Sequence, residues 1–378
     1  MYLVRDFGDM IADRVRMGAY EEALRQSVKP GSVVVDIGAA TGIFTLLACR
    51  FGARKVYAIE PNPAIDVARA LVRDNGFHDR VEIIPKMSTD VELPEKADVI
   101  VSDVRGVLPT YMSSLATIID ARSRWLKPGG VLVPKRDEMR AAVVDVPSLH
   151  GEILRPWSRE YHYDFDASAG MAAATSHWSS VREKEIKEAD LLTEPATWAT
   201  IDYERVLDRQ VRGRAVLRAA RSGTGHGLAV WFDATLLEGI QFSNLPGKST
   251  IHGRAFFPWP SAVALEEGTP IEVELSAVPA EDDYVFSWAA RIGGASPREF
   301  RQTDFFARVR MDELIQSDDP RPRKLAPRGL HTLKALEFVH AGATQSEAAT
   351  KLAEAFPEKF PSHEAALFAI RAILRKYT

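Results

Sequence analysis

The stretch VVVDIGAATG, residues 33–42, joins a run of valines to a loop of small residues. Valine and isoleucine favour a buried strand, and the apolar residues of 41–51 that follow are typical of a helix. Asp36 lies near the end of the strand, and the loop after it contains only glycine, alanine and threonine. Small residues at this position let the backbone approach a ligand at the carboxyl edge of a parallel sheet, beside a helix N-terminus.

Strand and helix signals alternate from residue 31 to residue 134. Pro63 stands near the start of the second expected helix, where proline is favoured, and the sequence KPGG at 127–130 predicts a turn. This alternation predicts an α/β fold with a doubly wound parallel sheet. The expected strands are 32–38, 55–60, 80–84, 97–102 and 131–134, and the expected helices are 41–51, 63–75 and 110–126.

The pattern changes after about residue 145. Residues 150–195 are mixed and rich in aromatic side chains, and short alternating strands dominate from about 198 to 295. Short strands of this kind indicate a β-barrel or a sandwich. Residues 316–324 are rich in proline and charge, which is typical of a linker.

The C-terminal segment, residues 325–378, has a helical pattern. Thr344 and Glu347 have the spacing of a capping box at a helix start. Three interpretations stay open: a helical cap that buries an apolar stripe, a peptide-recognition module, or a helix-turn-helix that binds DNA. The second is suggested by a weak resemblance to the small helical part of domains similar to the pyrroloquinoline-quinone peptide chaperone.

The composition excludes several classes of function. A net charge of −4 over 378 residues gives no case for a nucleic-acid-binding protein. Cys49 is the only cysteine, so an internal disulfide is impossible and a metal site built mainly from thiolates is excluded; we expect no metal. No run approaches the ~18 apolar residues of a membrane span, and residues 1–10 have no signal-peptide pattern. We therefore expect a cytoplasmic protein that binds no membrane.

The loop after the first strand departs from the dinucleotide pattern GxGxxG. Ala40 replaces the second glycine and Ile43 the third, so the spacing favours a cofactor without a pyrophosphate. Glu60 ends the second strand, where a carboxylate can accept hydrogen bonds from two ribose hydroxyls. The alternative interpretation is a tight turn followed by a glutamate that faces solvent.

Three segments together resemble the protein arginine methyltransferase family over about residues 8–300. They are VVVDIGAATGIFTLLACRFGARKVYAIEPN, VELPEKADVIVSD and ARSRWLKPGGVLVP. The resemblance implies a Rossmann-like methyltransferase sheet followed by a β-barrel, S-adenosyl-L-methionine as the cofactor, and a homodimer formed through an inserted arm. The expected domains are an N-terminal helix at 1–30, the cofactor-binding domain at 31–145, the barrel at 146–315 with its arm at about 160–195, and a helical domain at 325–378.

The resemblance also implies roles for individual residues. Arg16, in the segment DRVRMGAY, would bind the cofactor carboxylate. The methionine part would lie against Asp36, Gly38, Ala40 and Gly42. The ribose would lie at Glu60 and Pro61, the adenine at Met87 and Ser88, and Asp103 would face both the cofactor and the acceptor.

The segment after the fourth strand departs from the family pattern. The family has two glutamates there that hold the substrate guanidinium; the first position is Asp103 and the second is Met112. Arg105 adds a like charge, which disfavours a guanidinium. We therefore expect an acceptor that is neutral or anionic, such as a carboxylate, a hydroxyl or an amine. The alternative is that Asp103 caps a helix or pairs with Arg105.

A second family marker, a Thr-His-Trp loop, corresponds to Ile251, His252 and Gly253. The resemblance pairs His252 with Asp13 on the N-terminal helix, where the two side chains could orient each other. The alternative is a histidine on the barrel surface. Asp103, Arg105, His252 and Asp13 are thus the expected catalytic residues.

Three functions remain open from the sequence. The first is a methyltransferase that modifies a non-arginine acceptor by O- or N-methylation of a peptide, a protein side chain or a small molecule. The second is a true protein arginine methyltransferase with an altered clamp. The third is a non-catalytic dimeric scaffold, which has no use for a ribose-binding carboxylate such as Glu60.

Overall fold

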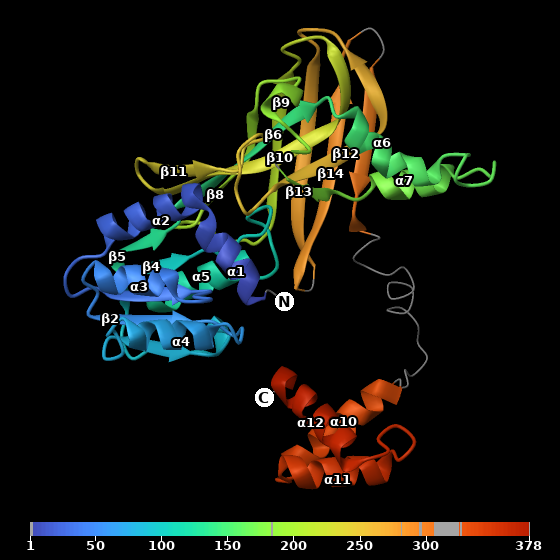
Figure 1. Ribbon diagram of the computed structural model, residues 1–378. Helices are drawn as coiled ribbons and strands as arrows, with labels where there is room; N and C mark the ends of the chain where they lie inside the picture. Colours follow the sequence, from blue (N-terminus) through green and yellow to red (C-terminus); the bar gives the residue numbers. More distant parts are fainter. Residues whose placement is uncertain are drawn as a thin grey trace. The chain divides into compact units, whose positions relative to one another are not determined.

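A five-stranded parallel sheet forms the N-terminal part of the chain in the computed structural model (Figure 1). Its strand order is β3-β2-β1-β4-β5. All five residues of β1 are buried, as expected for a central strand that is covered on both faces. The strands are β1 (Val33–Ile37), β2 (Lys55–Ile59), β3 (Val81–Ile84), β4 (Ala97–Ser102) and β5 (Leu126–Val133), and the helices before and between them are α1 (Val4–Ala12), α2 (Arg14–Ser27), α3 (Ile43–Arg50), α4 (Ile65–Asp74) and α5 (Ser114–Trp125).

The expected turn at 127–130 lies inside β5 rather than before it. Leu126 pairs with Ala97, but the next paired residue is Val131, opposite Val99. Gly129, with φ +75°, provides the left-handed backbone that this interruption requires. The strand therefore begins earlier than the sequence predicts, and the turn becomes an irregularity in its pairing.

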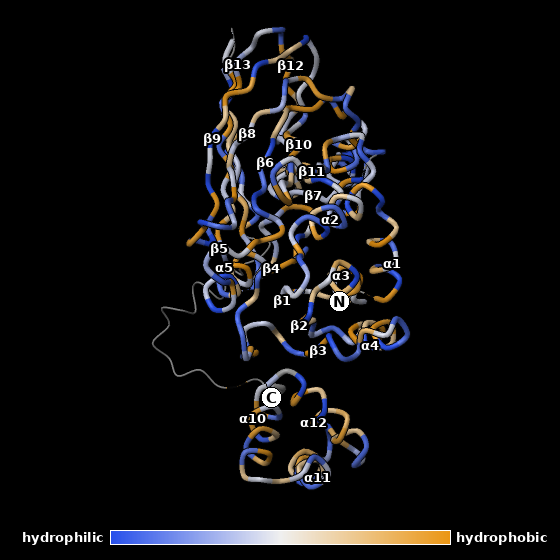
Figure 2. The backbone as a smooth tube through the Cα atoms, turned by 90° about the vertical axis from the view of Figure 1, so that its left-hand side faces the viewer, coloured by the Kyte–Doolittle hydropathy of each residue, from blue (hydrophilic) through white to orange (hydrophobic). Residues whose placement is uncertain are grey.

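Two antiparallel sheets follow and form a barrel-like body. The six-stranded sheet has the order β7-β12-β10-β6-β8, with β11 beside β10, and the four-stranded sheet has the order β15-β14-β13-β9. In Figure 2, apolar and polar segments alternate along these strands. The strands are β6 (Arg136–Val144), β7 (Ser179–Val181), β8 (Ala196–Asp202), β9 (Val211–Arg218), β10 (Gly223–Leu237), β11 (Ile240–Ser243), β12 (Arg254–Leu265), β13 (Pro270–Ala280), β14 (Asp283–Ile292) and β15 (Arg298–Thr303).

Strand β10 is buried on both of its faces. Leu228, Val230 and Phe232 point into the main core, which the two antiparallel sheets share with the parallel sheet. Ala229 and Trp231 point to the opposite face, in a second cluster that α6 (Pro147–Leu154) helps to cover. This double burial explains why the sequence of β10 is a nearly continuous apolar run.

Strand β6 lies outside the sheet to which the sequence assigns it. Residues 31–145 were expected to form the parallel domain, yet β6 pairs antiparallel with β10 and with β8. The boundary between the two sheets thus falls at the cis peptide bond Val133–Pro134 and Lys135, before β6. Alternation in RDEMRAAVV gives no sign of which sheet the strand joins, because both partners are distant in sequence.

The segment expected to be an arm contains short helices that project from the barrel (Figure 1). Between α6 and α7 (Ser168–Thr175) lies a 3-10 turn at Arg155–Trp157. Trp157 packs against Gly170, where a Cβ would come within 1.9 Å of the indole ring. This contact packs the 3-10 turn against α7.

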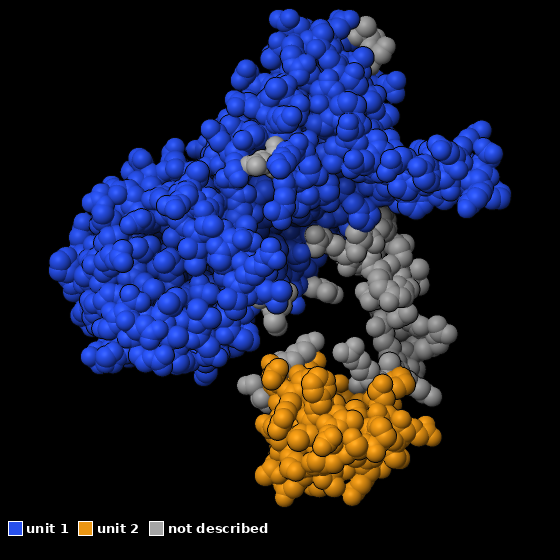
Figure 3. Space-filling view, in the orientation of Figure 1, with its two compact units in different colours: residues 1–310 blue, residues 311–378 orange. Residues whose placement is uncertain are grey.

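The chain divides into two compact units, Met1–Arg310 and Met311–Thr378 (Figure 3). The structure describes residues 3–182, 184–280, 282–294, 297–305, 325 and 327–377; the expected linker at 316–324 lies outside them. The second unit has its own core around Leu352, Phe360 and Ile370. Its helices are α10 (Pro327–His340), α11 (Gln345–Ala355) and α12 (His363–Tyr377).

The predicted capping box at the start of α11 is confirmed. The Thr344 hydroxyl accepts a hydrogen bond from the Glu347 amide at 3.3 Å, and the Glu347 carboxylate accepts one from the Thr344 amide at 2.8 Å. The predicted fold class is also confirmed: a parallel Rossmann-like sheet, barrel-like antiparallel sheets and C-terminal helices. None of the helices in the described part of the chain is long and apolar enough to cross a membrane.

Candidate active site

The loop between β1 and α3 needs glycine at two positions. Gly38 has φ +73° and Gly42 has φ +85°. A Cβ on Gly38 would lie 2.9 Å from Val104, and a Cβ on Gly42 would lie 2.8 Å from the Ala68 Cβ. The small residues therefore let the loop close on the segment after β4 and on α4. Ala40 also adopts a left-handed φ, at +50°, which is uncommon for a residue with a side chain.

Asp36 lies under this loop and is fully buried. Its Oδ2 accepts a hydrogen bond from the Thr45 hydroxyl at 2.6 Å, whereas Oδ1 is buried without a hydrogen-bond partner among the described residues. Burial raises the pKa of Asp36 to about 7. A buried oxygen without a partner indicates a missing donor, and the ammonium group of a bound amino acid is one such donor.

Glu60 is fixed at the same edge of the sheet. Its carboxylate accepts hydrogen bonds from the amides of Ala40 at 3.1 Å and Asn62 at 2.8 Å. Burial raises the pKa of Glu60, and these two bonds oppose that shift. Both oxygens keep lone pairs, so the carboxylate can still accept from ribose hydroxyls. Pro61, the next residue, is exposed beside it.

The expected adenine-side residues, Met87 and Ser88, lie at a 3-10 turn (Ser88–Asp90) after β3. Ser88 is buried, and its carbonyl accepts a hydrogen bond from Arg124 at 2.8 Å. Met87 is about half exposed at the start of the turn. Arg124 thus fixes the backbone of the turn, while the apolar side chain of Met87 is accessible to solvent.

Arg16 is buried on α2 and reaches toward Asp103. Its Nε donates to Asp103 Oδ2 and its Nη1 donates to the Met10 carbonyl at 3.0 Å. Nη2 makes no hydrogen bond with any described residue. Since a guanidinium binds a carboxylate well, Nη2 can donate to a carboxylate of a ligand without leaving Asp103.

Asp103 is the negative centre of the site. Besides Arg16, its Oδ1 accepts from Arg105 at 2.8 Å, and its Oδ2 lies 3.5 Å from His252 Nε2. Burial alone would raise the pKa of Asp103, but Arg16, His252 and Arg105 hold it well below its usual range. Asp103 is therefore a buried carboxylate that stays ionised, which is not the role of a helix cap.

Arg105 does not point toward an acceptor. Its side chain is 3% exposed and forms two bonds to the Asp137 carboxylate, from Nε at 2.7 Å and from Nη2 at 3.0 Å. Nη1 donates to Asp103 and to the Tyr20 hydroxyl at 2.8 Å. The expectation that this charge repels a guanidinium acceptor therefore lacks support, because the structure uses it inside the protein.

Asp137 and Tyr203 complete this ion cluster and were missed by sequence reasoning. The Tyr203 hydroxyl donates to Asp137 Oδ2 at 2.5 Å, and both residues are buried. Asp137 lies on β6, and Tyr203 directly follows β8. A fully buried aspartate in a strand leaves no local spacing signal, since its partner Arg105 is 32 residues away.

His252 and Asp13 do not form the direct pair that the resemblance implies. Asp13 caps α2 through the Arg16 amide at 3.0 Å and accepts from the Ile251 amide at 2.9 Å. His252 Nδ1 lies 3.0 Å from the Gly106 carbonyl. A carbonyl only accepts, so Nδ1 carries a proton and Nε2 faces Asp103. Asp13 thus fixes the backbone at Ile251, whereas the His252 ring faces the Asp103 carboxylate.

Known proteins resemble this chain in sequence and in fold. Residues 20–144 match the family model of ribosomal protein L11 methyltransferase (PrmA). The chain is 32% identical over 287 residues to protein arginine N-methyltransferase 6 of Danio rerio, covering 73% of this chain and 82% of that protein.

Two solved structures share the fold. The open crystal structure of Arabidopsis thaliana protein arginine methyltransferase 10 has a TM-score of 0.69 and 25% identity, and the match covers 78% of this chain and 96% of that chain. The Trypanosoma brucei PRMT1 enzyme–prozyme heterotetrameric complex with AdoHcy has a TM-score of 0.71 and 22% identity, with coverage of 78% and 97%.

These relatives show that the chain is an S-adenosylmethionine-dependent methyltransferase. The chain belongs to the protein arginine methyltransferase family.

Replacing Asp36 by Asn tests the burial of this carboxylate. Because its pKa is raised in the folded chain, Asp36 stabilises the fold fully below its ordinary pKa near 3.8, and this contribution is lost as pH rises through about 7. The Asn variant lacks this pH-dependent contribution, and its amide oxygen can still accept the hydrogen bond from the Thr45 hydroxyl. We expect the stability difference between the two proteins to change by a few kcal/mol between about pH 4 and pH 8, measured by urea unfolding. A constant difference would contradict the raised pKa.

The ion pair of Arg105 and Asp137 predicts a non-additive pair of substitutions. Arg105→Met leaves the buried Asp137 without its ion pair, and Asp137→Leu leaves the buried Arg105 with Asp103 but without its two bonds to Asp137. Each change should cost about 3–5 kcal/mol of unfolding free energy. The double variant removes both charges and should regain most of that loss. Denaturant unfolding of the three variants measures this, and simple addition of the two single losses would contradict the buried pairing.

Proposed function

We propose that this chain transfers a methyl group to a guanidinium nitrogen of arginine in a peptide or a protein. S-adenosylmethionine supplies a methyl group that is already activated toward displacement. The nitrogen forms the new bond to the methyl carbon, the carbon–sulfur bond breaks, the sulfide leaves and one proton is released. The protein's residues then act by binding, orienting and balancing charge.

The residues at the β1–α3 loop fit the methyl donor. Arg16 Nη2 would hold its carboxylate, and Asp36 Oδ1 would accept from its ammonium group. Glu60 would accept from the ribose hydroxyls, and Met87 would border the adenine. These assignments are supported by the open donor of Arg16 and the unsatisfied buried oxygen of Asp36.

Asp103 is the observation that carries the proposal. It is an ionised carboxylate at the carboxyl end of β4, where a parallel sheet presents ligands. An ionised carboxylate accepts from a guanidinium through charge-assisted hydrogen bonds and fixes its plane. Asp103 would thus orient the nitrogen that attacks.

The case for a non-arginine acceptor rested on Arg105, on Met112 and on Gly253, which stands where the family has a tryptophan. Arg105 is bound to Asp137 and Tyr20, so it does not supply the expected like charge at the acceptor. The curated relatives are arginine methyltransferases, which favours arginine further. Two departures from the family clamp remain: Met112 replaces the second glutamate, and Asp103 is one methylene shorter than the first.

An arginine peptide tests the proposed reaction. We expect the peptide Gly-Gly-Arg-Gly-Gly to receive label from methyl-labelled S-adenosylmethionine, and acid hydrolysis should release it as methylarginine. Asp103→Asn should lower kcat/KM by on the order of a hundredfold, because the guanidinium loses an ionised partner.

Label that is released by mild base, as from a methyl ester, would contradict arginine as the acceptor and would support a carboxylate. Titration calorimetry with S-adenosylhomocysteine is the control for Asp103→Asn, since Arg16 also contacts this carboxylate. If Asp103→Asn also weakens the binding of S-adenosylhomocysteine, its lower kcat/KM does not report on the peptide acceptor alone.

We propose, as a second point, that the chain works as a homodimer. Three aromatic side chains of the arm are exposed, including Tyr163 at 86% and Phe165 at 72%. The arm forms a protrusion on the surface of the first unit (Figure 3). Apolar surface gathered on a protrusion is typical of an interface.

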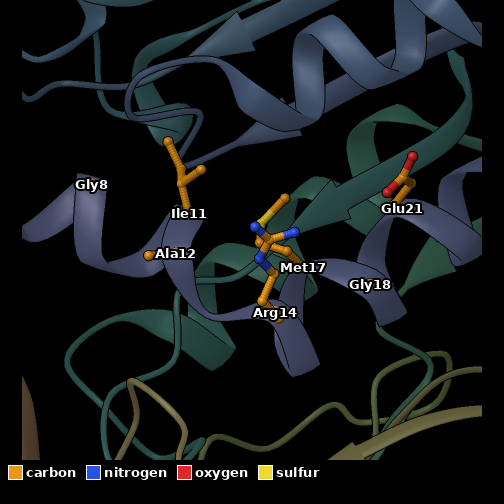
Figure 4. Close-up of a pocket in the computed structure, with 7 residues that line it drawn as sticks. All are labelled: Gly8, Ile11, Ala12, Arg14, Met17, Gly18 and Glu21. Atoms are coloured by element: carbon orange, nitrogen blue, oxygen red, sulfur yellow. The ribbon is translucent and has the colours of Figure 1, made fainter.

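A groove on α1 and α2 is a suitable site for the arm of a second copy. It has a volume of about 760 Å³. Figure 4 shows its residues along the junction of the two helices: small or apolar residues, with the charged Arg14 and Glu21 beside them. Aromatic side chains that fill well-packed pockets supply much of the binding energy of many interfaces.

Light scattering tests the dimer. We expect a dimer at micromolar concentration and a monomer for the variant with Tyr163→Ser and Phe165→Ser. Gly18→Trp should also give a monomer, because Gly18 lines the groove and a Cβ there would meet no neighbouring side chain within 4 Å, so the added indole would compete with the arm for this space. Glu267→Ser, an exposed change between β12 and β13 that lies outside both the arm and the groove, is the control. A monomeric wild-type protein would contradict the proposal.

A further inference from the structure

The segment after β4 folds back on itself, so its two ends lie near each other. Gly106 leaves no room for a side chain, since a Cβ there would lie 2.6 Å from the ring of Tyr111. The Gly106 carbonyl is the group that His252 contacts. Tyr111 therefore packs beside the His252 and Asp103 end of the segment, and it brings the next residue, Met112, to the same neighbourhood.

Met112 is held there by a carboxylate from the barrel. Its amide donates to Asp283 Oδ1 at 3.0 Å, and Asp283 is the first residue of β14. Met112 is 51% exposed and has φ +44°, a left-handed conformation that is uncommon for methionine. The end of β13 and β14 that carries Asp283 reaches toward the parallel sheet (Figure 1). An acid of the barrel thus contacts the backbone of the residue that corresponds to the second glutamate of the clamp.

We propose that Asp283 is the second carboxylate that binds the acceptor guanidinium. This inference rests on the proposed arginine methylation and assigns one acid of the clamp to β4 and the other to the barrel. Asp283 is partly exposed, so it can meet an arginine side chain that enters from solvent. Two carboxylates from different elements can bind opposite edges of one guanidinium, which has five N–H donors.

A competing role for Asp283 is purely structural, as an acceptor that holds the strained turn at Met112. The two roles differ in what they need from the side chain. The turn needs only an oxygen, which an asparagine retains, whereas a guanidinium clamp needs the negative charge. Asp283→Asn therefore removes the charge that a guanidinium needs and keeps an oxygen that can accept from the Met112 amide.

The experiment measures both binding and methylation of Gly-Gly-Arg-Gly-Gly by the full chain. Affinity is taken with S-adenosylhomocysteine present, and kcat and KM with S-adenosylmethionine. We expect Asp283→Asn to weaken peptide affinity and raise KM by about tenfold or more, through the loss of a charged hydrogen-bond acceptor. Affinity for S-adenosylhomocysteine should stay unchanged.

Two further variants make the result specific. Asp282→Asn changes the same charge at the neighbouring exposed residue and should have little effect. Adding Met112→Glu to Asp283→Asn restores a carboxylate at the family position and should recover most of the lost affinity. Gly-Gly-Lys-Gly-Gly serves as a peptide without a guanidinium.

The outcomes separate the two proposals. If the wild type methylates the arginine peptide and Asp283→Asn behaves like Asp282→Asn, the assignment of Asp283 is wrong and the proposed function stands. If the wild type neither binds nor methylates the arginine peptide in preference to the lysine peptide, both are wrong. Loss in Asp283→Asn with recovery by Met112→Glu supports both.

Discussion

The buried chain of charges from Arg16 through Asp103 and Arg105 to Asp137 is the interaction on which the rest of the site depends. It joins α2, the end of β4 and strand β6, and it therefore crosses from the parallel sheet to the barrel. A buried ion pair is not by itself a large source of stability, because desolvation offsets the attraction. Its effect is positional: removing Asp103 breaks the ion pair of Arg16, and removing Arg105 breaks the ion pair of Asp137, so the cluster favours one arrangement.

This arrangement explains how an arginine can stand two residues from the candidate catalytic carboxylate. Asp137 and the Tyr20 hydroxyl take most of the donors of Arg105, and one donor remains for Asp103. The positive charge of Arg105 is thus buried between Asp103 and Asp137. Together with Arg16 and His252 it keeps Asp103 ionised in a buried place. Asp103 thus contacts both Arg16, a candidate cofactor residue, and His252, which precedes strand β12 of the barrel.

Local sequence patterns were sufficient for the parallel sheet, its glycine loop and the C-terminal helices. Val33–Ile37, Gly38 and Gly42 encode their roles within a few residues, and so does the capping box at Thr344. Pairings between distant residues were not predictable. The partner of Arg105 lies on a strand whose sheet is set by antiparallel pairing.

The barrel-side contacts show the same limit. Asp13 contacts the backbone of Ile251 rather than the ring of His252, a shift of one residue that the sequence does not encode. Asp283, 171 residues after Met112, has no motif of its own.

The protonation of Asp103 tests the central claim most directly. Carbon-13 NMR of the aspartate carboxyl groups, assigned by comparison with Asp103→Asn, follows this residue as pH is lowered. The charge cluster predicts that the Asp103 signal stays unchanged through the range near pH 4 in which exposed aspartates titrate, down to the pH at which the protein unfolds. A signal that titrates at or above the ordinary value for aspartate would contradict the account, because Arg16, Arg105 and His252 would then not be holding the charge.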